Sequence, residues 1–379
     1  MSKVFSPSPL FTRVERARRR KHKFRDTQIT LAHGSGGRAM HELIEELFLE
    51  YFRNPLLEQL EDQAVFDLAL NPVPPAATNG NGQSKIRMAL TTDSYVVDPI
   101  FFPGGDIGKL AINGTVNDLA MSGARPLYLS TGFILEEGFP VADLKTILAS
   151  MSDAAAEANV AIVTGDTKVV QKGSADKLFI NTSGVGVLES SAVQVSAAAA
   201  QVGDKVIVSG NIGDHGTTIM IARGELELET EIESDTAPLN LMVQEMFSNA
   251  GSNAAAIHCL RDPTRGGVAT TLNEISFSSD VCIEIDEALI PVREEVRGAC
   301  EILGLDPLYV ANEGKLIAVV AAEIAEGLVA TMKRNRYGAD ACIIGEVTAE
   351  PQGIVAMRTG FGGTRIVDML AGDQLPRIC

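Results

Sequence analysis

Strand and helix patterns alternate along most of this 379-residue chain, and they do so in two separate blocks. The first block runs from residue 86 to 189 and the second from residue 204 to 347. Short β-branched or apolar runs predict the strands, and apolar residues every three to four positions predict the helices. This pattern favours an α/β fold of two domains, each with its own sheet and core.

Local patterns place individual elements within the two blocks. Ahead of the first block we predict a helix within 31–52. In the block itself we predict strands at 86–93, 126–135, 160–170 and 178–189, and helices at 106–124 and 141–159. In the second block we predict strands at 204–210, 281–291, 316–322 and 341–347, and helices at 217–225, 268–279, 293–304 and 325–335. The segment 196–203 is predicted to be a connector, so we place the boundary between the domains near residues 189–196.

The chain also divides by charge. Residues 1–25 hold nine Lys or Arg and one Glu, a net charge of +8 within a total of −17, so the remaining chain carries −25. Hydrophobic residues make up 45% of the chain, enough to bury sizeable cores. We therefore predict a basic disordered extension at 1–27, an N-terminal domain at 28–192, a C-terminal α/β domain at 193–368 and a mobile tail at 369–379.

The acidic body excludes several classes of partner. Negative surfaces repel phosphate backbones and anionic lipids, so we expect neither nucleic-acid nor membrane binding. No apolar stretch reaches the ~18 residues that span a bilayer, and the N-terminus lacks the apolar core of a secretory signal. The five cysteines are odd in number and widely spaced, with no CxxC pair. These features favour a cytoplasmic protein with reduced thiols.

Acidic residues of the first block are candidate metal ligands. Asp93 ends a predicted strand, Asn117 and Asp118 lie in an otherwise apolar helix, and Asp166 follows a strand. Carboxylates within apolar runs need partners when they are buried, and oxygen ligands suit Mg²⁺ with a nucleotide triphosphate better than zinc or iron. Each carboxylate could instead cap a turn or a helix. The residues alone leave both interpretations open.

A glycine-rich segment and a lysine add candidates for phosphate binding. In HGSGGR, Gly34, Gly36 and Gly37 precede a predicted helix. They could let backbone N–H groups approach a phosphate, or they could form an ordinary turn. Lys168 lies two residues past Asp166 and therefore on the same side of a strand. It could neutralise a phosphate, act as a base, or be a plain surface lysine.

Further candidates lie in the second half of the chain. Asp262 in DPTRGG precedes a helix and Glu313 in ANEGKL precedes an apolar strand, although ordinary turn chemistry would explain either. His215 in GDHG is expected to be structural. Cys379, the last residue of the sequence, could act as a carrier arm on a free tail or could be an incidental exposed thiol.

Taken in order, these segments resemble the HypE family, the carbamoyl-dehydrating maturation factors of [NiFe]-hydrogenases. The motifs that carry the resemblance are HGSGGR, LTTDSYVVDPIFFPGGDIGKLAINGTVNDLAMSGARP, VTGDTKVV, GDHG, DPTRGGVATTLNEI, ANEGKL and the terminal PRIC. They cover roughly residues 28–379, and PRIC is the most specific of them. The basic extension and a Pro- and Gly-rich loop at 71–84 depart from the pattern without touching a motif.

The family resembles a wider superfamily that includes aminoimidazole ribonucleotide synthetase, selenophosphate synthetase and thiamine monophosphate kinase. This resemblance implies an α/β fold of the α+β sandwich type, with two domains like those of aminoimidazole ribonucleotide synthetase. It implies that the domain at 28–192 pairs with a second copy in a homodimer. It also implies that ATP, with Mg²⁺, binds in the cleft between the domains.

The resemblance further implies a reaction on the chain's own tail. A carbamoyltransferase, HypF, would load a carbamoyl group onto Cys379 as a thiocarboxamide. ATP would phosphorylate the carbonyl oxygen, a base would remove protons from the nitrogen, and phosphate would leave an S-cyanide, or thiocyanate. The HypC–HypD complex would accept the cyanide on iron, for the Fe(CN)₂CO centre of the hydrogenase.

Motif matching assigns a role to each candidate. Glu313 and Lys168 would lie beside the thiocarboxamide, with Glu313 the better nitrogen base. The expected metal ligands are Asp93, Asp118 and Asp166, and the expected nucleotide-site residues are Gly34, Gly36, Gly37, Asn117 and Asp262.

Two alternatives remain open at this point. A selenophosphate synthetase usually has a reactive Cys or selenocysteine near its glycine-rich loop, whereas no Cys precedes Cys259 here. A non-catalytic scaffold that used its tail as a docking peptide should not hydrolyse ATP.

Overall fold

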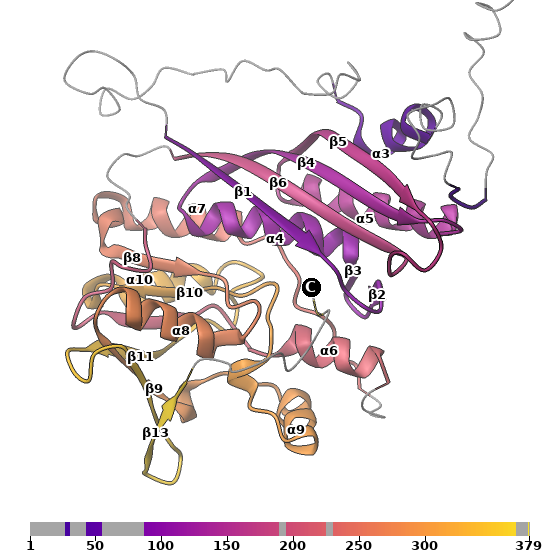
Figure 1. Cartoon of the computed structure of the whole chain (residues 1–379). Coiled ribbons are helices and arrows are strands. Elements are labelled where there is room, and N and C mark those ends of the chain that lie inside the picture. The colour runs from indigo at the N-terminus through magenta and orange to yellow at the C-terminus, as the bar shows by residue number, and fades with distance from the viewer. Residues whose placement is uncertain are drawn as a thin grey trace, which may run out of the picture.

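The structure is a computed structural model that describes residues 27–30, 43–54, 87–188, 195–224, 230–368 and 378. Figure 1 shows two parts, one built on a four-stranded sheet and the other on a seven-stranded sheet. The predicted α/β fold of two domains, each with its own sheet, is confirmed.

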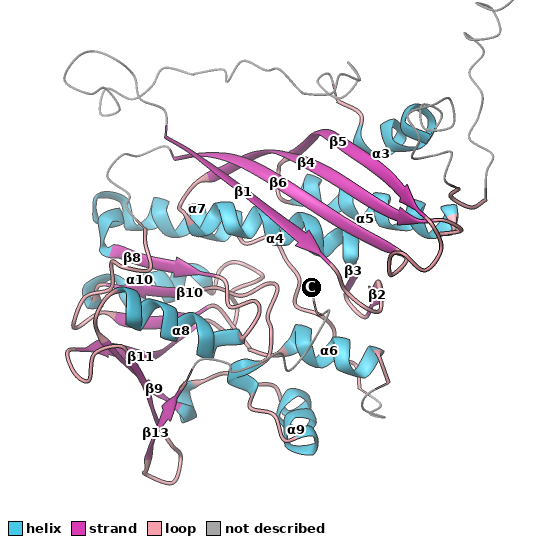
Figure 2. Ribbon diagram, in the orientation of Figure 1, coloured by secondary structure: helices cyan, strands magenta, loops and turns pink. Residues whose placement is uncertain are grey.

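The first sheet has the strand order β1-β6-β4-β5, in which only β4 and β5 are paired in parallel. Its strands are β1 (Arg87–Tyr95), β4 (Arg125–Glu136), β5 (Ala161–Val170) and β6 (Leu178–Leu188). Helices α4 (Ile107–Met121) and α5 (Val141–Glu157) cover its inner face, as Figure 2 shows. The described residues place no helix on its outer face, where Leu90 is 79% exposed.

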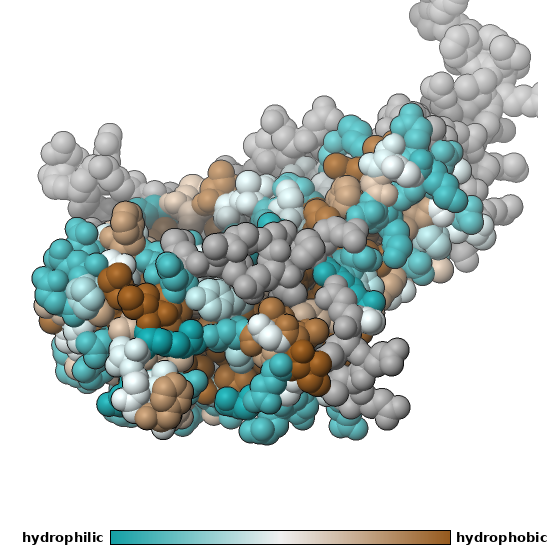
Figure 3. Space-filling view, turned by 60° about the horizontal axis from the view of Figure 1, so that its bottom comes forward, coloured by the Kyte–Doolittle hydropathy of each residue, from teal (hydrophilic) through white to brown (hydrophobic). Residues whose placement is uncertain are grey.

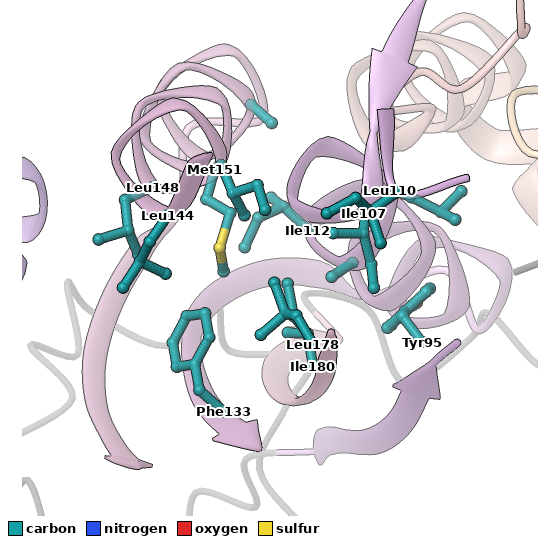
Figure 4. Close-up of a cluster of buried hydrophobic side chains, with 14 of the residues drawn as sticks. Tyr95, Ile107, Leu110, Ile112, Phe133, Leu144, Leu148, Met151, Leu178 and Ile180 are labelled. Carbon is teal, nitrogen blue, oxygen red and sulfur yellow. The ribbon is translucent and has the colours of Figure 1, made fainter. Parts of the chain in front are cut away.

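A buried core fills the space between this sheet and its helices. Along β4, Leu129 and Phe133 are buried whereas Ile134 is exposed, because alternate residues of a strand point to opposite faces. Figure 4 shows side chains of β1, β4 and β6 directed toward those of α4 and α5: Tyr95, Ile107, Leu110, Ile112, Phe133, Leu144, Leu148, Met151, Leu178 and Ile180. A short hairpin of β2 (Phe101–Phe102) and β3 (Gly105–Asp106) leads into α4.

Helix α4 joins the two domains. Its N-cap residue is Asp106, whose Oδ1 accepts hydrogen bonds from the N–H groups of Gly108 (2.7 Å) and Lys109 (3.1 Å). Nearly all of its side chains are buried, because the sheet covers one side and α7 (Asn240–Ala250) of the second domain packs on another. Gly114 allows α4 to lie close to strand β1, since a Cβ at this position would lie 2.2 Å from the hydroxyl oxygen of Tyr95.

The second sheet has the order β13-β12-β9-β11-β7-β10-β8, and only β9 and β12 are paired in parallel. Its strands are β7 (Lys205–Val208), β8 (Ile257–Arg261), β9 (Cys282–Asp286), β10 (Ile317–Val320), β11 (Cys342–Thr348), β12 (Ile354–Arg358) and β13 (Thr364–Val367). Helix α8 (Gly267–Ser278) packs with Val206 and Val208 on one face of the sheet. Helices α7 and α10 (Ala322–Met332) pack with Ile207 on the other.

Two further helices complete the second domain, and one of them, α6 (Asp214–Ala222), contacts β2 of the first domain. Helices α6 and α9 (Glu294–Leu303) pack against each other around Val296, Cys300 and Val310. In the described part of the N-terminal region, a π-helix (Ile44–Phe48) and α3 (Leu49–Phe52) lie within the predicted helical segment 31–52.

Most predicted elements are confirmed within a few residues, but some predictions were wrong. The predicted strand at 281–291 ends at Asp286, where a 3₁₀ turn (Glu287–Leu289) begins. The sequence patterns also missed α7, β8, β12 and β13. These elements are short or lack a clear period, so tertiary packing rather than local pattern decides their conformation.

The surface carries both polar and apolar side chains. Figure 3 shows hydrophilic and hydrophobic residues interspersed on the face that it presents. Within the described residues, no helix is both long enough and apolar enough to cross a membrane.

Candidate active site between the two domains

Acidic side chains from both domains face a common region between the two sheets. Thr91 Oγ1 on β1 donates a 3.0 Å hydrogen bond to Asp118 Oδ2 on α4. Asp93 lies on the same inner face of β1 as Thr91, because the two are two residues apart on a strand. From the second domain, Asp262 follows β8 and Glu313 precedes β10. We call these four acidic residues the carboxylate cluster.

The charges of the cluster act on one another. Burial, followed by the negative charges of Asp262 and Asp93, raises the pKa of Asp118 to about 7. Burial and Asp93 raise the pKa of Asp262 to about 6, although the nearby Arg261 opposes this shift. Asp118 and Asp262 therefore carry a proton more readily than they would in water, because they are buried and lie near other negative charges.

Glu313 is the most strongly perturbed member of the cluster. Its side chain is 4% exposed, and Oε1 has no hydrogen-bond partner among the described residues. Burial, together with the negative charges of Asp235 and the other cluster members, raises its pKa well above the usual range. A buried carboxyl group with an unpartnered oxygen and a raised pKa is suited to exchange protons with a bound group.

A buried ion pair supports the backbone of Glu313. Asp235 Oδ1 accepts a 3.1 Å hydrogen bond from the N–H of Glu313, and Asp235 Oδ2 lies 3.0 Å from Lys315 Nζ. Burial alone would raise the pKa of Asp235, but the charge of Lys315 holds it below its usual range. Gly314 permits the approach, because a Cβ at this position would lie 1.8 Å from the carbonyl oxygen of Asp235. The sequence motifs assign no role to Asp235 or Lys315.

Asn117 holds the two domains together at this site. Its Oδ1 accepts a hydrogen bond from the N–H of Leu239 (2.8 Å). Its Nδ2 donates to the carbonyl oxygens of Ala237 (3.0 Å) and Glu313 (3.3 Å). The side chain is 1% exposed. Its amide is thus occupied by backbone groups, which supports a positioning role, and the predicted contact with a nucleotide stays a prediction.

Asp166 and Lys168 lie away from the carboxylate cluster. The strand register pairs Asp166 with Gly132, between the buried Thr131 and Phe133, so its side chain points to the outer face of the sheet. There it forms a 3.0 Å ion pair with Lys168, and both side chains are more than half exposed.

The predicted metal site therefore needs correction. Asp93 lies on edge strand β1 and faces inward, whereas Asp166 lies on the opposite edge strand β5 and faces outward. Three strand spacings of about 4.8 Å separate the two edges, so one chain cannot place both carboxylates on a single ion. For the same reason, Lys168 cannot lie beside Glu313 of its own chain. Across the described residues, no three His, Cys, Asp or Glu side chains are arranged to hold a metal ion.

The remaining predicted residues fall at or near the two ends of the chain. Gly34, Gly36, Gly37 and Cys379 lie outside the described residues. Of the tail predicted at 369–379, the structure describes Ile378. This residue is 3% exposed and belongs to the first core, together with Ile219 and Ala311. Ala311 is two residues from Glu313, so the end of the chain returns to the neighbourhood of the carboxylate cluster.

Comparison with protein families and relatives gives a consistent result. The N-terminal domain model of the AIR synthase related proteins matches residues 61–188, and the C-terminal domain model matches residues 201–358. The carbamoyl dehydratase HypE of Azotobacter vinelandii is 52% identical over 355 residues, which cover 94% of this chain and 98% of that protein.

Solved structures show the same relationship. A crystal structure of the hydrogenase maturation protein HypE in complex with ATP has a TM-score of 0.83 at 49% identity, and covers 92% of this chain and 99% of that chain. A HypE–HypF complex has a TM-score of 0.71 at 50% identity, with coverage of 86% and 99%. Thiamine monophosphate kinase from Aquifex aeolicus, at 20% identity and a TM-score of 0.53, with coverage of 75% and 89%, shares the fold.

Proposed function

Since the chain belongs to the HypE family of carbamoyl dehydratases, we propose that it dehydrates a carbamoyl group carried on Cys379, with ATP as co-substrate. The observation that carries this proposal is Glu313, a buried carboxyl group with one oxygen that has no hydrogen-bond partner among the described residues. It lies in a segment close to Ile378, since a Cβ at Gly216 would lie 3.2 Å from Ala311 N and 3.3 Å from Ile378 Cδ1.

Amide dehydration in water is unfavourable because hydroxide is a poor leaving group. The proposed reaction converts a thiocarboxamide and ATP into a thiocyanate, ADP and inorganic phosphate. The carbonyl oxygen takes the phosphoryl group, the nitrogen loses two protons, and the C–O bond breaks as phosphate departs. A binding region enclosed between the domains would keep water from the activated intermediate.

Glu313 supplies the base in this account. Burial and neighbouring carboxylates raise its pKa, so its carboxylate accepts a proton more readily than an exposed glutamate does. Asp235 and Asn117 hold the backbone of Glu313 on both its N–H and its carbonyl side, which fixes the position of the side chain. These contacts support the predicted role of Glu313 as the nitrogen base.

Mg²⁺ fits the carboxylate cluster better than the predicted set that included Asp166. Asp93, Asp118 and Asp262 come from three elements on the inner side, and their negative charges oppose one another. Among the described residues, no three such side chains are arranged to hold an ion on their own. A divalent cation that enters with the triphosphate would relieve this repulsion, so we propose that these three residues hold it together with phosphate oxygens. When bound, Mg²⁺ would screen the charge of the triphosphate during phosphoryl transfer.

A homodimer gives the outer-face residues a role. The outer face of the first sheet exposes Met88, Leu90 and Ile134 by 49%, 79% and 42%, which favours contact with a second copy. Lys168 and Asp166 project from this same face. In such a dimer the two residues lie at or near the contact between copies, and Lys168 can act only at the site of the other copy.

For partners, we propose a carbamoyltransferase of the HypF type and a HypC–HypD complex as the acceptor of cyanide. A HypE relative at 50% identity has been crystallised with HypF, which supports the first of these. The second follows from the predicted product, because a thiocyanate donates its cyanide to a metal acceptor.

Intact-mass measurement tests the proposal. The chain is incubated with HypF, carbamoyl phosphate and ATP, and the C-terminal peptide is then analysed. We expect Cys379 first to gain one carbamoyl group and then to lose one water in a step that consumes ATP. A peptide that gains the carbamoyl group and never loses water would contradict the proposed dehydration and would favour the scaffold alternative.

A further inference from the structure

We propose that the segment 213–216 (GDHG) is the docking site for the end of the chain, and that His215 positions the thiol of Cys379 by holding the backbone of Ile378. This inference rests on the function proposed above, because it concerns how the tail presents its thiocarboxamide. His215 contributes no reacting group in this account. It is a positioning residue.

A short chain of hydrogen bonds fixes the backbone of Ile378. His215 Nε2 lies 2.7 Å from the carbonyl oxygen of Ile378, and His215 Nδ1 lies 2.7 Å from Ser234 Oγ. A carbonyl oxygen can only accept, so Nε2–H must donate to it and Nδ1 must accept from the hydroxyl of Ser234. Ser234 Oγ in turn accepts from the N–H of Thr236 (3.2 Å). The backbone therefore determines which tautomer His215 adopts.

The surroundings keep His215 neutral and immobile. The ring is fully buried and packs edge to face against Phe102, with 5.6 Å between the ring centroids. Burial lowers the pKa of His215, although the nearby Asp235 opposes this effect. A neutral imidazole retains both the donor toward Ile378 and the acceptor toward Ser234.

An apolar pocket receives the side chain of Ile378. This side chain is 3% exposed and belongs to a core that includes Ile219 and Ala311. Gly216 lines the pocket, because a Cβ at this position would lie 3.3 Å from Ile378 Cδ1 and 2.5 Å from Val310 Cγ1. The GDHG segment therefore holds the tail through one polar and one apolar contact.

The same two segments that hold Ile378 also build the site around Glu313. Ser234 precedes Asp235, whose carboxylate binds the N–H of Glu313. Ala311 lies two residues before Glu313, and both Ala311 and Ile378 lie beside Gly216. Consecutive Cα atoms are ~3.8 Å apart, so holding Ile378 confines Cys379 to the immediate neighbourhood. The docking site thus sets the register of the thiol relative to the base.

The first test shifts this register without altering the folded domains. One glycine is inserted between Ile378 and Cys379, which leaves the docking contacts in place and moves the thiol by one residue. A displacement of this size should slow the ATP-dependent loss of water by at least ~100-fold, while carbamoyl loading by the partner transferase stays near the wild-type rate. Conversion at the wild-type rate in the insertion variant would overturn the proposed register.

The second test removes each docking contact. His215→Phe keeps a ring against Phe102 but has no donor, His215→Gln can still present an N–H, and Ile378→Ala empties the pocket. We expect slow conversion in His215→Phe and Ile378→Ala, and a faster rate in His215→Gln than in His215→Phe. Ile366→Ala, at an isoleucine that is 63% exposed on β13, is the matched control and should convert normally.

A third measurement does not depend on activity. Alkylation of Cys379 by iodoacetamide, followed on the C-terminal peptide without ATP, should be several-fold faster in His215→Phe and Ile378→Ala than in the wild type and Ile366→Ala. Equal alkylation rates in all four proteins would overturn the docking site. If the wild type shows this protection but never converts a thiocarboxamide, the docking site stands and the proposed function fails.

Discussion

Glu313 illustrates how residue identity and surroundings combine at this site. Any glutamate can act as a base, but this one is buried, has an unpartnered oxygen and lies among other carboxylates. Glu313 could be predicted as a candidate base from the sequence, because it lies in the ANEGKL motif. The buried pair of Asp235 and Lys315 beneath it could not, since those residues are about 80 positions apart and meet only in the fold.

Glu313→Gln should separate loading from dehydration. The amide keeps the size of the side chain but cannot accept a proton as a carboxylate does. Loss of a general base typically slows a reaction by ~10²–10⁴, so the variant should accumulate thiocarboxamide on Cys379. Mass spectrometry of the C-terminal peptide measures this accumulation. Glu323→Gln, on the exposed side of α10, is the control, and an unchanged conversion rate in Glu313→Gln would exclude Glu313 as the base.

The raised pKa of Asp118 predicts a pH dependence of stability. Its pKa is about 7 in the folded chain and ~3.9 in an unfolded chain, so between these values the folded state binds more protons. The contribution of Asp118 is therefore favourable at low pH and is lost as the pH rises through about 7. Without Mg²⁺, Asp118→Asn should gain thermal stability relative to the wild type between about pH 5 and pH 8.

Differential scanning fluorimetry across this pH range measures the effect. Asp166→Asn is the matched control, because Asp166 lies on the exposed outer face. The difference in melting temperature between this control and the wild type should not change with pH over the same range. If the difference between Asp118→Asn and the wild type is also independent of pH, Asp118 is ionised throughout.

At the scale of elements, long periodic segments were predictable and short ones were not. Helices α4 and α5 and the strands of the first sheet follow from local pattern, and the structure confirms them. Helix α7 and strands β8, β12 and β13 were missed, because their conformation depends on neighbours that the sequence does not reveal. The face on which each side chain of β1 and β5 lies could not be predicted either, so nothing in the sequence indicated that Asp93 faces inward and Asp166 outward in one chain.

Two glycines in helices should respond oppositely to substitution by alanine. At Gly108 of α4, a Cβ would lie 2.7 Å from the carbonyl oxygen of Ile147, so Gly108→Ala should destabilise the fold by ~1–3 kcal/mol. At Gly298 of α9, no described atom beyond the helix's own backbone and the two neighbouring residues lies within 4 Å of the added Cβ, so Gly298→Ala should stabilise by ~0.5–1 kcal/mol. Urea unfolding measures both, and a loss at Gly298 as large as that at Gly108 would contradict the packing described here.

At the scale of the whole molecule, the chain has one sheet face that its own described helices do not cover. The outer face of the first sheet carries exposed apolar side chains together with Asp166 and Lys168. The inner face, by contrast, is sealed by α4, which also binds the second domain through Asn117. Dimerisation through the outer face would bury the apolar residues and leave the carboxylate cluster between the two domains of each copy.

Leu90→Asp should weaken this dimer. Leu90 is 79% exposed on the outer face, and a charge at the contact between copies would have to lose its hydration on association. Phe361→Asp, at a residue that is 89% exposed on the second domain, is the matched control. Analytical ultracentrifugation should show a larger fraction of monomer for Leu90→Asp alone. If both variants and the wild type sediment alike, the outer face is not the dimer contact.

In the proposed reaction, the oxygen of the carbamoyl group leaves this protein as phosphate. The most direct measurement loads Cys379 with a carbamoyl group labelled with ¹⁸O, adds ATP, and analyses the inorganic phosphate by mass spectrometry. We expect one ¹⁸O atom in the phosphate for each thiocyanate formed, and almost none from Glu313→Gln. Thiocyanate formation with unlabelled phosphate would contradict the proposed reaction, because the oxygen would then have left by another route.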